Sequence, residues 1–145
     1  VAHHDAISSL QSIIVNMGLE HSVTLFGARD DMPAVWHHTD IAMLVSEDDA
    51  STYNGVCAMM AGVPLVCAPM HACCEIVENN KTGFIMEGAT EKDIEATIRG
   101  LLENPHKTRK VASAGQQVAR FCYTLEENAQ ALYQIHKELF SNRIS

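Results

Sequence analysis

The sequence predicts an α/β fold: a Rossmann-like open parallel sheet with helices on both faces. Short apolar, β-prone runs alternate along the chain with segments of helical periodicity. Such alternation implies right-handed crossovers between parallel strands. The run 41–45 is apolar at every position, as expected of a strand covered on both faces. The 145 residues, 47% of them hydrophobic, suffice for a single domain spanning 1–145.

The first third of the chain is expected to hold a helix, a strand and a short helix. In residues 5–17 apolar side chains recur at helical spacing, and Gly18 follows as a left-handed cap. Residues 23–26 form a β-prone run that ends at a glycine. Residues 33–39 begin with a proline, which favours the first turn of a helix.

The middle third is expected to contain the rest of the sheet. The predicted order is a strand at 41–45, a helix at 53–61, a strand at 64–68, a helix at 73–78, a turn at 79–81 and a strand at 83–86. Gly62 closes the first of these helices.

The final third is expected to be helical throughout, with three start signals. These are Thr90 with Asp93 as a capping box, Asn104 before a first-turn Pro105, and Thr124 with Glu127 as a full capping box. In the helix after Pro105, the side chains expected to face the core are Val111, Val118 and Phe121.

Composition and charge exclude several classes of function. The formal net charge of −8 argues against nucleic acid as a partner, because such proteins neutralise many phosphates. No run approaches the ~20 apolar residues that span a bilayer, and no signal-peptide pattern is present. A cytoplasmic protein without a transmembrane segment is expected, and attachment at the membrane periphery stays open. The five cysteines, two of them adjacent, favour reduced thiols.

Three loops are expected to form the ligand site, because open α/β sheets bind ligands at the carboxyl ends of their strands. They are 27–32, 46–52 and 69–72. Neither G-x-G-x-x-G nor G-x-x-x-x-G-K-[ST] occurs, so a dinucleotide site or a P-loop is not expected. A generic flavodoxin-like domain fits the alternation of elements and stays as an alternative.

The loop 46–52 carries the most polar chemistry. Its three consecutive acids, Glu47, Asp48 and Asp49, are suited to bind ribose or sugar hydroxyls, or they form a solvated turn. Ser51 and Thr52 come just before a helix, where free backbone N–H groups favour a diphosphate. A plain N-cap explains the two hydroxyls equally well.

Histidine and cysteine offer weaker candidates. None falls into C-x-x-C or H-E-x-x-H spacing, so no metal is expected. His71 lies in a predicted ligand loop, where it either contacts a ligand or is polar surface. Cys57 is either a reactive thiol or a buried, inert residue, and the second interpretation is favoured because no histidine lies near it in sequence.

Three segments carry a family pattern in the same order. They are 23–33 (VTLFGARDDMP), 40–64, and 75–84 (EIVENNKTGF). Together they resemble the C-terminal half of retaining GT-B glycosyltransferases, the glycosyl transferases group 1 family, in which this half binds the donor. The resemblance implies a nucleotide-diphosphate sugar as donor substrate, no metal or other cofactor, and a glycan or lipid as acceptor. It also implies that the family's first strand and N-terminal acceptor domain are missing from this chain.

The resemblance assigns roles to individual positions. Asp49 would face the donor sugar as the catalytic residue. The donor-binding residues that it implies are Arg29 and Asp31 beside the base, Ser51, Thr52 and Tyr53 by the diphosphate, Cys57 at the ribose, and His71 in the sugar-facing loop.

Departures from the family pattern motivate a second function. The positions of Asp49 and Cys57 are both usually glutamate, and Ala50 and Thr52 replace glycines that admit close backbone approach. Loss of a carboxylate at the ribose costs on the order of 1.5 to 3 kcal/mol if the hydroxyls go unpaired. The alternative is a non-catalytic binding or assembly domain with a degenerate donor pocket.

Overall fold

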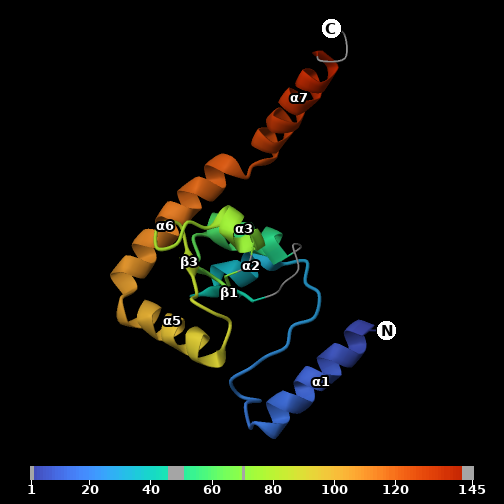
Figure 1. Cartoon of the computed structure of the whole chain (residues 1–145). Helices are drawn as coiled ribbons and strands as arrows, with labels where there is room; N and C mark the ends of the chain where they lie inside the picture. Colours follow the sequence, from blue (N-terminus) through green and yellow to red (C-terminus); the bar gives the residue numbers. More distant parts are fainter. Residues whose placement is uncertain (1, 46–50, 70, 142–145) are drawn as a thin grey trace. The chain divides into compact units, whose positions relative to one another are not determined.

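The computed structural model of the chain describes residues 2–45, 51–69 and 71–141 (Figure 1). The chain divides into two compact units, Val1–Met32 and Pro33–Ser145. The second unit contains a parallel sheet with helices on both sides, so the predicted α/β class is confirmed.

The first unit is built around helix α1 (Ala2–Asn16). After it, Gly18 adopts the left-handed conformation with φ of 66°, and the Leu19 N–H donates to the Ile14 carbonyl at 3.0 Å. Glycine adopts this conformation without steric cost, so both the predicted helix and its predicted cap are confirmed.

The segment 23–26 is not a strand, so that prediction was wrong. A β-prone run becomes a strand only when its backbone pairs with a neighbour, and no strand in the described residues pairs with it. The Val23 N–H instead donates to the Leu19 carbonyl at 2.9 Å, and Phe26 lies exposed.

The sheet of the second unit has three described parallel strands. They are β1 (Ala42–Leu44), β2 (Leu65–Cys67) and β3 (Phe84–Ile85), in the order β1-β2-β3. Ala42 is paired with Leu65, and Val66 is paired with Phe84. All three strands fall within the runs 41–45, 64–68 and 83–86 that the sequence predicts as strands.

Six helices accompany these strands in the described part of the chain. They are α2 (Met32–His37), α3 (Ser51–Ala61), α4 (His71–Ile76), α5 (Glu91–Glu103), α6 (Pro105–Cys122) and α7 (Leu125–Ser141). Helix α3 ends at Ala61, and the φ of 80° at the following Gly62 confirms the predicted closing glycine. No helix among the described residues is both long and apolar enough to cross a bilayer.

The core of the second unit has two layers, because side chains of a strand alternate between its faces. Leu65 and Cys67 of β2 belong to a buried cluster that contains Met59 of α3. Val66 points the other way, into a cluster with Leu101 of α5. The sheet therefore lies between α3 on one side and α5 on the other (Figure 1).

The prediction that 41–45 is covered on both faces was wrong for one face. Ala42 is buried, but Met43 is 41% exposed and Val45 is also exposed. Strand β1 lies at the edge of the described sheet, whereas β2 lies between two strands and is buried at every position.

Helix α6 departs in part from its expected inward face, and the apolar side chains of α7 lie exposed. Val111 is buried and Val118 is half-buried, but Phe121 is 76% exposed, so its predicted place in the core was wrong. The Thr124 hydroxyl accepts from the Glu127 N–H at 3.2 Å, which is one half of the predicted capping box. The apolar side chains Leu125, Leu132, Ile135 and Leu139 of α7 are exposed.

Helix α5 begins with the capping box that the sequence predicted. The Thr90 hydroxyl accepts from the Asp93 N–H at 3.3 Å, and the Asp93 carboxylate accepts from the Thr90 N–H at 3.0 Å and from its hydroxyl at 2.6 Å. The hydrogen bond from the Thr90 hydroxyl, then that from its backbone, holds the pKa of Asp93 below its ordinary value of 3.8.

Thr90→Ala is expected to lower the free energy of unfolding by about 1 kcal/mol, the usual cost of losing an N-cap hydroxyl. A carboxylate with a depressed pKa stabilises the fold above its unfolded pKa and loses this effect as the pH falls through the folded pKa. The deficit should therefore be full near about pH 6 and smaller near about pH 2. Urea unfolding at both values measures it, and Thr124→Ala at the start of α7 is the matched control. A deficit that grows on acidification contradicts this account of the cap.

Candidate functional site

Two of the three predicted ligand loops leave the same edge of the sheet. Strand β1 ends at Leu44 and α3 begins at Ser51, whereas β2 ends at Cys67 and α4 begins at His71. Because β1 and β2 are parallel neighbours, both connections start at their carboxyl ends. Helices α3 and α4 pack against each other. The two helices therefore begin near one another, at the carboxyl ends of β1 and β2. Asp49, together with Glu47 and Asp48, lies outside the described residues.

A glycine lies where α3 packs on the sheet. A Cβ atom at Gly55 would lie 2.7 Å from Leu44 Cδ1 and 3.0 Å from Ile76 Cδ1. These distances are shorter than van der Waals contact, so the side chains of Leu44 and Ile76 would have to shift to admit a larger residue. Gly55 thereby allows the close contact of α3 with β1 and α4 on the helix that carries Tyr53 and Cys57.

The first turn of α3 contains an unpartnered hydroxyl. The Thr52 Oγ1 atom is buried and has no hydrogen-bond partner in the described structure. A buried hydroxyl without a partner costs about 1 to 3 kcal/mol. It lies in the first turn of α3, and the first N–H groups of any helix have no partner within the helix, so that together with the helix dipole they favour an anion. Ser51, the first residue of α3, precedes it directly.

Tyr53 and Cys57 are brought together one turn apart on α3. Hydrogen bonding with the Cys57 side chain, followed by its electrostatic effect, raises the pKa of Tyr53 above its ordinary value. Tyr53 is 74% exposed and Cys57 is half-buried. Cys57 was expected to be buried and inert. It is only half-buried, with its thiol beside an exposed phenol, and its reactivity stays a prediction.

Arg29 and Asp31 form a bidentate pair in the first unit. Arg29 Nε donates to Asp31 Oδ1 at 2.7 Å, and Arg29 Nη2 donates to Asp31 Oδ2 at 2.5 Å. Their mutual hydrogen bond raises the pKa of Arg29 and lowers that of Asp31. The guanidinium also lies 4.9 Å from the centre of the Phe26 ring, within the range of a cation–π contact.

Metal-binding groups do not gather in the described residues. No set of three or more histidine, cysteine, aspartate or glutamate side chains there is placed to hold a metal ion. The rings of His37 and His38 meet edge to face with centroids 5.8 Å apart, and His38 Nδ1 lies 2.9 Å from the Ala34 carbonyl oxygen. His71 opens α4, as expected for a residue in or beside the loop after β2.

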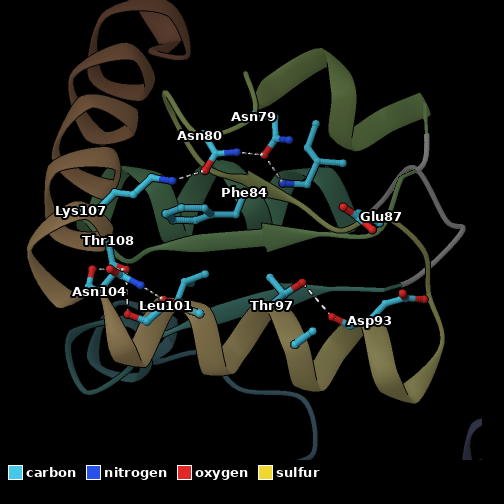
Figure 2. A pocket seen from close by; sticks show the side chains of 13 residues that line it. Asn79, Asn80, Phe84, Glu87, Asp93, Thr97, Leu101, Asn104, Lys107 and Thr108 are labelled. Carbon is cyan, nitrogen blue, oxygen red and sulfur yellow. Dashed lines mark hydrogen bonds between the residues drawn. The ribbon is translucent and has the colours of Figure 1, made fainter.

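A pocket that the sequence did not predict lies between β3 and the helices α5 and α6 (Figure 2). Its volume is about 460 Å³, and none of the predicted site residues that the structure describes lines it. The polar side chains that line it include Asn80 and Lys107 at one end and Glu87 at the other. A signal was present in the sequence, because the small residues Ala96 and Gly100 lie four positions apart on one face of α5.

Comparison with known proteins gives a consistent family. The model of the family described as glycosyl transferases group 1 matches residues 6–118. No curated protein matches the chain significantly.

Several solved structures are similar to the chain. The structure of Anabaena Alr3699/HepE in complex with UDP-glucose is 26% identical, with a TM-score of 0.82 over 92% of this chain and 37% of that one. A glycosyltransferase from Rickettsia africae ESF-5 is 17% identical, with a TM-score of 0.88 over 97% of this chain and 38% of that one. Sucrose-phosphate synthase from Thermosynechococcus elongatus is 18% identical, with a TM-score of 0.80 over 92% of this chain and 34% of that one. At these identities the last two show the fold alone. The chain spans less than two-fifths of the length of each of these proteins.

Proposed function

This chain belongs to the glycosyl transferases group 1 family, and from that premise we propose that it binds a nucleotide-diphosphate sugar for transfer to a glycan or lipid acceptor. The observation that carries the proposal is the buried, unpartnered Thr52 hydroxyl at the start of α3. A donor diphosphate at this helix start would supply its missing partner. The likeness to a structure that holds UDP-glucose supports a donor of this class.

The proposal gives each candidate residue a place around the donor. Asp49 faces the sugar as the catalytic residue. The proposed donor contacts are Arg29 and Asp31 at the base, Ser51, Thr52 and Tyr53 at the diphosphate, Cys57 at the ribose, and His71 in the sugar-facing loop. We assign the 145 residues to the donor-binding half of a GT-B enzyme and the acceptor to a second, N-terminal domain.

The chemistry that we propose is electrostatic and retaining. As the bond between sugar and diphosphate breaks, negative charge grows on the departing phosphate oxygens. The N–H groups and hydroxyls at the start of α3 would stabilise this charge, because donors that are already oriented lower the barrier most. No cofactor takes part in this proposal.

A second candidate function is a non-catalytic binding or assembly domain. The observation that favours it is the Cys57 side chain, which engages Tyr53 on its own helix and offers no carboxylate to a ribose. In that case the domain retains the parallel sheet of the family but no longer binds the nucleotide-sugar donor.

Calorimetric titration of the full chain with UDP-glucose, GDP-mannose and ADP-glucose tests the first function against the second. We expect saturable binding of one donor, and we expect Asp49→Ala to weaken it at least about tenfold. Asp40→Ala is the matched control, because Asp40 precedes β1 and therefore lies at the opposite edge of the sheet. Its loss should leave affinity unchanged. Absence of binding for all three donors contradicts the first function and favours the second.

A further inference from the structure

The pocket between β3 and the helices α5 and α6 has the form of an open groove (Figure 2). Its volume of about 460 Å³ lies within the range of small-molecule sites, roughly 300 to 1,000 Å³. Asn80 and Lys107 lie toward one end, before β3, whereas Glu87 and Asp93 lie at the other end, beyond its carboxyl end. The groove therefore runs along β3, from the amino end of this strand to its carboxyl end.

One face of α5 forms a wall of the groove. The residues that line it recur at spacings of three and four: Asp93, Ala96, Thr97, Gly100, Leu101 and Asn104. The hollow exists because the middle of this face is small. A Cβ atom added at Gly100 would meet nothing within 4 Å.

The polar residues at the end of the groove before β3 are held in place by hydrogen bonds to one another. Lys107 Nζ donates to Asn80 Oδ1 at 2.8 Å, and Asn80 Nδ2 donates to Asn79 Oδ1 at 3.2 Å. Asn80 adopts the left-handed conformation with φ of 60°, which asparagine tolerates better than most residues. The remaining N–H groups of Lys107 and of the Asn79 amide are left as donors toward a ligand.

The groove supplies acceptors at both ends. The Glu87 carboxylate, at the end beyond β3, forms no ion pair with any described residue. Asn104 follows α5 at the same end as Lys107, and its Nδ2 donates to the Gly100 carbonyl at 3.0 Å, which leaves its Oδ1 as an acceptor. Donors and acceptors in one groove suit a ligand whose groups act as both, as hydroxyls do.

The charge of the lining residues and the hydrogen bonds along the outer edge of β3 exclude two classes of ligand, polyanions and extended peptides. One lysine and two carboxylates line the groove, so it does not suit a polyanion. A peptide would pair with the outer edge of β3, but that edge is already occupied. The Ile85 N–H donates to Asn79 Oδ1 at 2.9 Å, and the Gly83 carbonyl accepts from the Asn80 N–H at 2.8 Å.

We propose that this groove binds a short, neutral saccharide chain at a place separate from the donor site. The choice of a saccharide among neutral, hydroxyl-rich ligands rests on the proposed glycosyl transfer. The groove would hold a growing or finished glycan beside the domain, with one end directed to the sheet edge at which the donor is proposed to bind.

The test is a titration of the ¹⁵N-labelled full chain with four neutral hexasaccharides, monitored through the amide chemical shifts in NMR spectra. The four are maltohexaose, cellohexaose, chitohexaose and mannohexaose. We expect saturable shifts for at least one of them at the amides of Asn80, Thr97 and Gly100. Gly100→Trp fills the groove and should weaken this binding at least about tenfold. Leu102→Trp places the same indole on α5 at an exposed position outside the groove and should leave it unchanged. If Gly100→Trp does not fold, Glu87→Ala serves instead and should weaken binding severalfold.

Several outcomes overturn the proposal. They are no shifts with any of the four hexasaccharides, shifts confined to residues outside the groove, equal affinity in Gly100→Trp, or tighter binding of a heparin hexasaccharide than of the neutral chains. UDP-glucose titrated into the same variants keeps the two sites apart. Donor binding that survives Gly100→Trp while saccharide binding is lost supports a separate groove, whereas failure of donor binding alone contradicts only the proposed function.

Discussion

Cys57→Glu is expected to strengthen binding of the nucleotide-sugar donor by about ten- to a hundredfold. Family members usually carry glutamate at this position, and a carboxylate accepts hydrogen bonds from both hydroxyls of a ribose, which a thiol cannot do. We expect the fold to tolerate the change, because Cys57 is half-buried and its neighbour Tyr53 is exposed, so the new charge would stay close to water. Calorimetric titration of both proteins with UDP-glucose measures the gain.

Cys57→Gln separates the effect of charge from that of size. Glutamine has nearly the shape of glutamate but makes weaker, neutral hydrogen bonds, so it should recover only part of the gain. Equal donor affinity in the native chain and in folded Cys57→Glu contradicts the placement of Cys57 at the ribose. It would also remove the main reason for regarding the donor pocket as degenerate.

Gly115→Ala is expected to lower the free energy of unfolding by about 2 kcal/mol or more, since overpacking of a core costs roughly 1 to 3 kcal/mol. A Cβ atom there would lie 2.2 Å from the Thr82 carbonyl oxygen, which belongs to the backbone and cannot rotate away. Helix α6 must therefore move from the turn before β3. Urea unfolding followed by the fluorescence of Trp36, the single tryptophan, measures the loss, because Trp36 packs against the cluster under α3.

Gly100→Ala is the matched control for this prediction. The same substitution on α5 meets nothing within 4 Å and removes a residue that weakens helices, so it should stabilise by up to about 1 kcal/mol. Opposite signs for the two variants would show that packing, and not helix propensity, decides the outcome at Gly115. Stabilisation by both would contradict the close approach of α6 to Thr82.

Most helices and the three strands of the second unit follow from the sequence, because their signals are local. The capping box of Thr90 and Asp93, the closing Gly62 and the apolar run of β2 each depend on residues a few positions apart. The family pattern is also local to three segments, and the family that it indicated is confirmed. The roles of Asp49, Cys57 and the other donor contacts stay predictions.

The failed predictions share a different cause. Residues 23–26 have the composition of a strand, but a strand needs a neighbour to pair with. Met43 and Phe121 have core-like side chains, and both are exposed, because burial depends on which element lies opposite. The type of a residue indicates whether its burial would be favourable. It does not indicate whether another helix or strand lies over that residue.

The sequence by itself determined the α/β class, the order of elements in the second unit and the family, since periodicity, caps and motifs act over a few residues. The tertiary structure decided which faces are covered, and it made the groove. That groove depends on Lys107 reaching Asn80 across 27 positions of sequence and on α5 presenting Gly100 beside β3. Contacts between residues so far apart exist only after the strands have paired and the helices have packed, so the spacing of small residues on α5 does not by itself predict the groove.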